Sequence, residues 1–373
     1  MSWQLTLDHL PDLARGAALL GSGGGGDPYV GRLMVERALR QGARITVWDL
    51  EEVPDQALVV PTAMMGAPTV MVEKIPSGGE GVHALRALER HLGREATATM
   101  PIECGGINST MPLVVAARTG KPVVDADGMG RAFPELQMET FHVFGVPGSP
   151  MAIANEHGDV TLVTAHDNWA MEWLARGITV RMGGASLIAE YAMEGATVKR
   201  VSIPGTLSLG IRLGRAIREA RERHRDPIEG LAEALRPSGY GPPRVLFDGK
   251  VEDVLRRTTE GFVRGSAHIR PFTSGPPLAI SFQNEHLIAE VEGEVLAVVP
   301  DLICILEAES GEPITTEGLR YGFRVVVLGI PCNAKWRSPA GLEVVGPRYF
   351  GYDVDYVPVE QRFARSRPSG GSR

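Results

Sequence analysis

A glycine run near the N-terminus constrains this chain more than any other feature of its sequence. Residues 21–27 read GSGGGGD, so five of these seven positions are glycine, and Pro28 follows. Ordering glycine costs backbone entropy, so such a run serves either disorder or a backbone geometry that side chains exclude. Segments with regular apolar spacing flank the run and favour an ordered loop. Loops of this kind bring bare backbone N–H groups close to a ligand, most often an anion.

The position of the run disfavours a nucleotide-binding loop. Leucines and alanines at three- and four-residue spacing predict a helix over residues 5–20, and a second helix is predicted over residues 30–41, ending at Gly42. A dinucleotide-binding loop instead lies between a strand and a helix, and a Walker loop continues into Gly-Lys-Ser/Thr. The sequence GSGGGGDP fits neither pattern.

Composition and charge narrow the class of protein. The chain has 373 residues, 43% hydrophobic and 22% charged, which is typical of a soluble protein with about two domains. A formal charge of −7 disfavours binding to nucleic acid. No apolar run approaches the ~20 residues of a membrane span, and no basic leader precedes an apolar segment, so we expect neither membrane insertion nor a signal peptide. Three widely separated cysteines, Cys104, Cys304 and Cys332, favour a reducing cytoplasm over a disulfide framework.

The alternation of apolar segments predicts an α/β fold with two domains. Buried-type strands are predicted over residues 44–49, 57–65 and 123–127, with helices over residues 83–92 and 110–119 between them. From Arg244 onward, short apolar runs separated by Gly and Pro predict a β-rich region. We therefore expect an N-terminal α/β layer domain with the glycine-rich loop over residues 1–167, a β-rich α+β domain over residues 168–360, and a disordered tail over residues 361–373.

A set of motifs in fixed order resembles the S-methyl thiohydantoin desulfurase family, which is often associated with hydantoinase and oxoprolinase proteins. The motifs are GSGGGGDPYVG, PIECGGINS, VVDADGMGRAFPELQM, RMGGAS, IPGTLSLGIRLGRA, FQNEHL, VPDLI and GPRYFGYDVDYVP. The resemblance implies two α/β domains, the second similar to a swivelling β/β/α domain. It also implies chemistry on a five-membered cyclic ureide or thioureide: water replaces the sulfur on the carbon between the two ring nitrogens and gives a hydantoin. Cys104 stands where an aliphatic residue is expected, so we do not assign it as an obligatory nucleophile.

Such a reaction needs an activated water, stabilisation of negative charge and a proton for the departing sulfur. Glu103, Asp125 and Asp127 are the candidate catalytic residues, because each follows a predicted strand. Asp125 and Asp127 stand two apart, so in a strand they face one side and form an acid/base or metal pair. Arg131 is the alternative, purely neutralising partner of that pair.

The candidate substrate-binding residues lie on two loops and one strand end. Backbone N–H groups of Gly23, Gly24, Gly25 and Gly26 suit developing negative charge. Asp27 either orients a ring N–H, binds a cation or caps the next helix. Asn108 either bonds an amide-like ring edge on two sides or stabilises a turn. Asn284 and Glu285 either form a second polar cluster facing the cleft or end a strand.

The sequence allows more than one cofactor and more than one type of partner. A divalent metal ion held by carboxylates is compatible with the sequence, but His142, His157 and His166 are spaced too widely for a helical zinc motif. The expected partners are a small cyclic ureide or thioureide and further copies of the chain, and neither nucleic acid nor membrane. The alternatives are an ATP-dependent component of the hydantoinase/oxoprolinase type and a non-catalytic ligand-binding or regulatory subunit.

Overall fold

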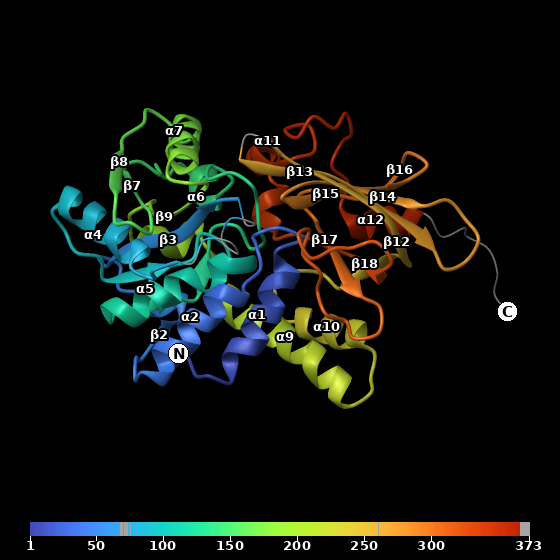
Figure 1. Cartoon of the computed structure of the whole chain (residues 1–373), viewed down its shortest axis with the longest axis horizontal. Coiled ribbons are helices and arrows are strands. Elements are labelled where there is room, and N and C mark those ends of the chain that lie inside the picture. The colour runs from blue at the N-terminus through green and yellow to red at the C-terminus, as the bar shows by residue number, and fades with distance from the viewer. Residues whose placement is uncertain (68–69, 71–73, 75, 260, 366–373) are drawn as a thin grey trace.

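The protein is a mixed α/β molecule built on two large sheets (Figure 1). This computed structural model describes residues 1–67, 70, 74, 76–259 and 261–365. The first sheet and its helices occupy the left of Figure 1, and the second sheet lies on the right. The predicted fold class, an α/β part followed by a β-rich part, is confirmed.

The first sheet has nine strands and a parallel centre. Its order is β1-β2-β5-β4-β3-β9-β7-β8, with β10 also paired to β3. The neighbours β2, β5, β4 and β3 run parallel, whereas β9, β7 and β8 extend the sheet in antiparallel pairing. The strands span Trp3–Gln4 (β1), Thr46–Trp48 (β2), Leu58–Gly66 (β3), Ala98–Met100 (β4), Val123–Val124 (β5), Met151–Ala154 (β7), Val160–Val163 (β8), Ala185–Ala189 (β9) and Met193–Glu194 (β10).

Helices cover this sheet with their apolar faces. In α1, Leu10, Leu13, Ala17 and Leu20 are all buried, as their spacing predicts. The helices of this part span His9–Leu20 (α1), Tyr29–Arg40 (α2), Glu80–Leu92 (α4), Met111–Thr119 (α5), Thr140–Val143 (α6), Asn168–Arg181 (α7) and Gly195–Val201 (α8), with 3-10 turns at Leu50–Glu52 (η1) and Gly106–Ser109 (η2).

The second sheet is entirely antiparallel and has seven strands in the order β16-β15-β14-β13-β12-β18-β17. They span Arg244–Thr259 (β12), Phe262–Pro271 (β13), Leu278–Gln283 (β14), Glu285–Val291 (β15), Glu294–Val298 (β16), Leu302–Glu307 (β17) and Arg324–Ile330 (β18). The accompanying helices span Thr206–Glu222 (α9), Pro227–Leu235 (α10), Pro339–Val345 (α11) and Val359–Arg365 (α12), with a 3-10 turn at Ala334–Arg337 (η3).

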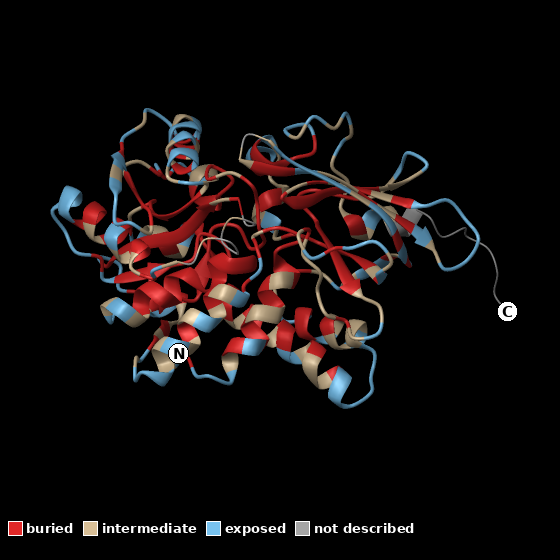
Figure 2. Cartoon of the chain, in the orientation of Figure 1, coloured by how far each residue is buried: buried red, intermediate tan, exposed pale blue. Residues whose placement is uncertain are grey.

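One hydrophobic core runs through both parts, as the continuous buried zone of Figure 2 illustrates. It includes Leu13 and Leu20 of α1 together with Leu287 of β15 and Leu302 of β17. Helix α1 also crosses α9 at very short range, since a Cβ added at Gly16 would overlap the carbonyl of Gly210. The two parts therefore form one packed body.

Three sequence expectations need correction. The strand expected over residues 123–127 is broken: β5 joins the first sheet, whereas Ala126–Asp127 (β6) pairs with Ile203–Pro204 (β11). Strand β13 was not predicted. The tail expected to be disordered from residue 361 is helical as far as Arg365, and residues 366–373 lie outside the described residues.

The expected domain boundary between residues 167 and 168 stays a prediction. Strands β9 and β10 follow that boundary in sequence and yet belong to the first sheet. The sheets alone therefore do not divide the chain at that point.

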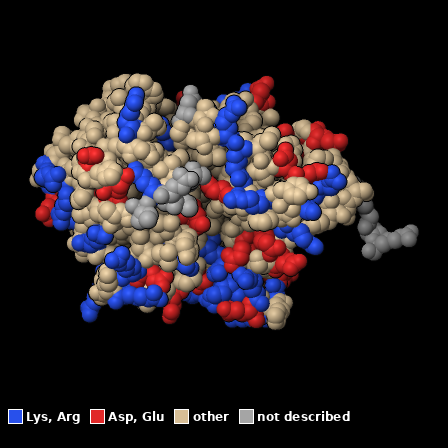
Figure 3. Space-filling view, in the orientation of Figure 1, with Lys and Arg blue, Asp and Glu red and all other residues tan. Residues whose placement is uncertain are grey.

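The surface carries charges of both signs. On the face shown in Figure 3, Lys and Arg side chains are interspersed with Asp and Glu, also in the lower region where α9 and α10 lie in Figure 1. Arg218 of α9, for example, pairs with Asp12 and Glu222. Among the described residues, no helix has both the length and the apolar character needed to cross a membrane.

Candidate active site

The glycine run lies where the two sheets meet, and its conformation requires glycine. Gly23, Gly25 and Gly26 have φ values of 92°, 70° and 75°, in the left-handed region. A Cβ at Gly23 would overlap the ring of His286, and one at Gly24 would overlap the carboxylate of Glu285. The run is thus packed directly against the first residues of β15.

Backbone hydrogen bonds fix this packing on both sides. The Ile107 N–H donates to the Gly25 carbonyl at 2.8 Å, and the Thr316 N–H donates to the Gly23 carbonyl at 2.6 Å. The amides of Gly24 and Gly25 themselves donate to Gly21 O and to Glu285 Oε1. These two amides are therefore already engaged within the protein and do not form an open phosphate cradle.

A small cavity lies beside Gly25, and two buried acids line it. Its volume is about 50 Å³, and Glu103, Asn108, Asn284 and Glu285 line it together with Gly25. Apolar side chains complete the wall: Met64, Met65, Ile102, Met129, Phe133 and Leu136. Five of the residues predicted for the site are therefore brought together, from three separate parts of the sequence.

Glu103 follows β4 and is held by Asn108. Its Oε1 accepts a hydrogen bond of 2.8 Å from Asn108 Nδ2. Asn108 in turn accepts from the Met64 N–H at 2.7 Å and donates to the Met64 carbonyl at 3.1 Å. In the described part of the chain, Glu103 Oε2 has no hydrogen-bond partner. The Asn108 amide thus positions Glu103, and the second carboxyl oxygen is buried without a partner among the described residues.

Glu285 is the first residue of β15, after a tight turn at Asn284. Asn284 has φ 58° and accepts from the Val263 N–H through Oδ1 at 2.8 Å, which fixes the turn. Glu285 Oε1 accepts from the Gly25 N–H at 3.0 Å. Its Oε2, like that of Glu103, has no hydrogen-bond partner among the described residues. The two buried acids of the cavity thus each have one bonded oxygen and one buried oxygen without a partner among the described residues.

Burial raises the pKa of both acids, and for Glu103 the negative charge of Glu285 adds to the shift. Burial raises the pKa of Glu285 to about 8, although Arg131 opposes the shift. Burial, followed by the negative charge of Glu285, raises the pKa of Glu103 well above its usual range; the Asn108 hydrogen bond and the nearby Phe133 backbone oppose this. Two acids with raised pKa values in one cavity are suited to general acid–base chemistry near neutral pH.

Arg131 supplies the buried positive charge next to this pair. Its Nη1 donates to the carbonyls of Pro300 and Asp301 at 2.9 and 2.8 Å, and its guanidinium lies 4.7 Å from the ring centre of Phe133. Arg131 is thus bonded to backbone carbonyls of the second part of the chain. It acts on Glu285 through charge, since no ion pair joins the two among the described contacts.

The two aspartates have a different environment. Asp125 Oδ1 accepts from the N–H groups of Leu207 and Ser208, at 2.9 and 3.1 Å, in the first turn of α9. Asp127 accepts from the Cys104 and Gly130 N–H groups at 2.6 and 2.8 Å. Neither residue lines the cavity. Their contacts favour a structural role, and the catalytic role expected for them stays a prediction.

The remaining predicted binding residues also lie outside the cavity. Asp27 is exposed, and its Oδ1 accepts from the Tyr29 N–H at 2.9 Å at the start of α2. Among the glycines of the run, Gly25 lines the cavity, and Gly23, Gly24 and Gly26 do not. The Cys104 thiol is buried, and burial raises its pKa well above the usual range, which disfavours a nucleophilic thiolate.

No metal centre is apparent in the described part of the chain, where no group of three His, Cys, Asp or Glu side chains is placed to hold an ion. The three histidines do not converge: His142 contacts Asn168, whereas His157 and His166 are exposed. A second buried acid pair, Glu139 and Glu190, lacks hydrogen-bond partners on its carboxyl oxygens among the described residues. Burial and their mutual repulsion raise the pKa of Glu139 well above its usual range.

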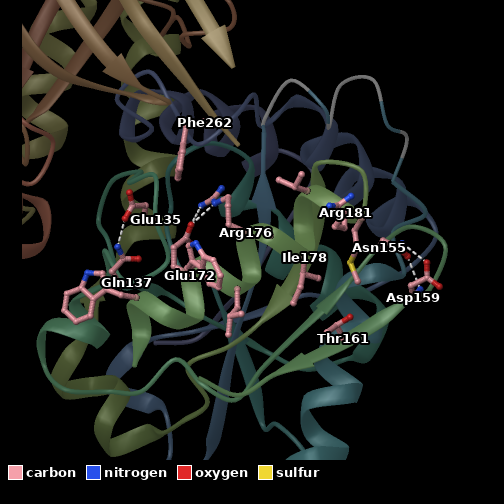
Figure 4. Close-up of a pocket in the computed structure, with 16 residues that line it drawn as sticks. Glu135, Gln137, Asn155, Asp159, Thr161, Glu172, Arg176, Ile178, Arg181 and Phe262 are labelled. Atoms are coloured by element: carbon pink, nitrogen blue, oxygen red, sulfur yellow. Dashed lines mark hydrogen bonds and ion pairs between the residues drawn. The ribbon is translucent and has the colours of Figure 1, made fainter. Parts of the chain in front are cut away.

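A larger chamber adjoins the small cavity. It is open to solvent, has a volume of about 1130 Å³ and runs along α7, with Asn155 and Thr161 on one side and Phe262 of β13 on another. Glu135 and Arg176 line both spaces (Figure 4). Arg176 donates to Glu172 Oε1 and to the Pro134 carbonyl at 2.7 and 3.0 Å, and lies 4.4 Å from the ring centre of Phe262. Arg176 was not predicted as a site residue, because nothing in the helical pattern of α7 distinguishes it from a surface arginine.

Fold and cavity together define a mixed α/β protein with a buried acid pair at the junction of its two parts. The family models described as "S-Me-THD-like, N-terminal domain" and "S-Me-THD-like, C-terminal domain" match residues 8–165 and 165–359. The chain therefore belongs to the S-methyl thiohydantoin desulfurase family, as its motifs indicated.

A solved structure shares the fold over nearly the whole chain. It is an X-ray crystal structure of a protein from Chromobacterium violaceum, 25% identical, with a TM-score of 0.81, covering 96% of this chain and 100% of its own. Its description names no activity. A search of curated proteins finds no match.

Proposed function

We propose that this protein hydrolyses an S-methyl thiohydantoin or a thiohydantoin ring and releases the sulfur in exchange for oxygen. Family membership supports an enzyme of this type. The observation that carries the proposal is the pair Glu103 and Glu285, two buried acids that line one cavity, each with an oxygen free of hydrogen bonds to described residues.

The atoms balance without a redox partner. Water adds through its oxygen to the ring carbon between the two nitrogens, and the carbon–sulfur bond then breaks. For an S-methyl ring, one water proton ends on the ring nitrogen of the C=N bond and the other on sulfur, so the products are a hydantoin and methanethiol. For a C=S ring, both protons end on sulfur, and the products are a hydantoin and hydrogen sulfide.

We assign the two proton-transfer roles to the acid pair. Glu285, with a pKa of about 8, is partly ionised near neutral pH, and its ionised form removes a proton from water. Glu103, whose pKa is raised well above its usual range, stays protonated and donates to the departing sulfur. The Gly25 N–H and the Asn108 amide hold the other carboxyl oxygen of each acid and thereby fix its orientation.

The test is a direct assay of the purified protein with S-methyl thiohydantoin and with 2-thiohydantoin. Thiol or sulfide is trapped, and hydantoin is quantified by chromatography. We expect one equivalent of hydantoin for each equivalent of released sulfur. Absence of sulfur release from every ring, with the protein folded and a chemical standard detected, would refute the reaction.

The same assay addresses the two alternatives. An ATP-dependent component would require added nucleotide for turnover, and a non-catalytic subunit would bind the ring without releasing sulfur. The engagement of the Gly24 and Gly25 amides with Gly21 and Glu285 disfavours phosphate binding at the glycine run.

A further inference from the structure

The chamber beside the acid pair has the features of a substituent pocket. Its wall is mostly apolar and includes Trp169, Trp173 and Ile178 of α7 together with Phe262 of β13. Trp173 is 76% exposed and Trp169 is 45% exposed, so two large aromatic rings stand open to a ligand. Pockets with an apolar wall and a few fixed polar groups are typical of small-molecule sites.

The residues shared by the two spaces suggest how a ring would lie. The inner cavity of about 50 Å³ can hold the reacting water, since roughly 10–15 Å³ of such space is enough for one. With the edge that carries sulfur at Glu103 and Glu285, the opposite edge of the ring is directed toward Glu135 and Arg176, which line both spaces. In a hydantoin ring, the C4–C5 edge is opposite the carbon between the nitrogens. A substituent on C5 is therefore directed away from Glu103 and Glu285, past Glu135 and Arg176.

We propose that the α7 chamber binds a large apolar, preferably aromatic, C5 substituent of the ring and selects substrates by it. This inference rests on the proposed function, because the position of the ring follows from the reaction at the acid pair. It specifies the substrate class: rings with a benzyl- or indolylmethyl-sized group on C5 in preference to unsubstituted rings.

Substitutions at Gly177 test whether the chamber binds the substituent. It lies in α7, lines the chamber, and a Cβ added there meets no atom within 4 Å. Gly177→Phe places a large side chain in the chamber, and Gly177→Ala is the matched control with only a methyl group. Both replace a helix-interior glycine by a better helix former, so neither is expected to unfold α7.

The experiment compares kcat and KM for S-methyl thiohydantoins with hydrogen, methyl, isobutyl, benzyl or indolylmethyl on C5. In the natural protein and in Gly177→Ala, we expect kcat/KM to be roughly 10- to 100-fold higher for benzyl than for methyl, mostly through KM, the range expected for burying a side chain of this size. In Gly177→Phe, this preference should fall to about twofold, while the unsubstituted ring keeps its kcat/KM.

Two outcomes overturn the inference and leave the proposed function intact. One is turnover of every ring with no preference among substituents. The other is a Gly177→Phe protein with unchanged selectivity but an altered oligomeric mass, which would assign the chamber to a second copy of the chain. If no ring is turned over, calorimetric binding of hydantoin and 5-benzylhydantoin still decides: equal affinities, or a benzyl preference that survives Gly177→Phe, overturn the inference.

Discussion

Two pairs of buried acids in this molecule look alike in sequence and differ in their hydrogen bonds. Asp125 and Asp127 accept from backbone N–H groups, Asp125 in the first turn of α9 and Asp127 from Cys104 and Gly130. Glu103 and Glu285 each retain an oxygen without a described partner and share a cavity. An unpaired carboxyl oxygen that lines a cavity can bind water or substrate, whereas Asp125 and Asp127 lie outside the cavity. The comparison teaches that position after a strand does not by itself bring an acid to the cavity.

The largest expected effect is the loss of kcat when Glu103 or Glu285 is replaced. Glu285→Gln removes the proposed base and should lower kcat by about 10²- to 10⁴-fold, and Glu103→Gln should do the same by removing the proposed acid. Steady-state assays with a thermal-unfolding check measure this. Glu294→Gln on β16, the same chemical change at an exposed position, is the matched control. A Glu285→Gln protein with normal kcat would contradict the catalytic role that we assign to Glu285 and not to Asp125 and Asp127.

A somewhat smaller effect is expected from crowding Glu285. A Cβ at Gly24 would overlap Glu285 Oε1, so Gly24→Ala must displace that carboxylate or the glycine run. We expect at least a tenfold loss of kcat together with a destabilisation of about 1–3 kcal/mol. Denaturant titration and turnover are measured on the same preparation. Gly177→Ala, where the added methyl meets open space, provides the comparison, and equal behaviour of the two variants would contradict the packing argument.

Replacing Asp125, which is bonded by backbone N–H groups, should lower the stability of the fold. Asp125→Ala removes the acceptor of two N–H groups in the first turn of α9 and should lower the free energy of unfolding by about 1–2 kcal/mol, as loss of a helix cap does. Below the unfolding temperature, kcat should stay within about threefold of the natural protein. A hundredfold loss of kcat at unchanged stability would instead support the catalytic role first expected from the sequence.

A separate expected effect, with no change in turnover, is on the pH dependence of stability. Burial raises the pKa of Glu139 well above its model-compound value of 4.5, so above that pH the folded protein keeps a proton that the unfolded chain has lost. This contribution is complete below pH 4.5 and declines as pH rises toward the folded pKa, by at most about 1.4 kcal/mol per pH unit. Glu139→Gln should therefore lose stability less steeply between pH 5 and 8. Equal slopes in urea titrations across this range would show that Glu139 does not titrate there.

Local patterns predicted much of the fold. The helices expected over residues 30–41 and 110–119 correspond to α2 and α5 within a residue or so, because their apolar faces repeat at helical spacing. Strand β13 escaped notice because its apolar residues are few and interrupted by Arg264, Gly265 and His268. The break between Val124 and Ala126 also escaped, because it depends on pairing with β11, some 80 residues later.

The residues of the candidate site were also predicted only in part. Gly25, Glu103, Asn108, Asn284 and Glu285 were predicted from short motifs, and these motifs converge on one cavity. Arg176 and Phe133 were not predicted as site residues, since they reach the cavity only through the packing of α7 and of the segment after β6. The partners of Asp125 and Asp127 were likewise hidden, because Leu207, Ser208 and Gly130 are joined to them by tertiary structure.

The crossing of α1 and α9 has a consequence for how this chain can be divided. The two family models meet at residue 165, yet α9 comes after that point and lies against α1, with Gly16 at the carbonyl of Gly210 and Gly214 at that of Asp12. The hydroxyl of Ser22 also donates to Ile303 O and accepts from Ile303 N–H, at 3.1 and 2.9 Å. A fragment that stops at the boundary of the family models would expose the apolar side of α1 and leave Ser22 unbonded. The two halves match separate family models, yet they pack against each other as one body, so a cut at residue 165 would open the contacts of both.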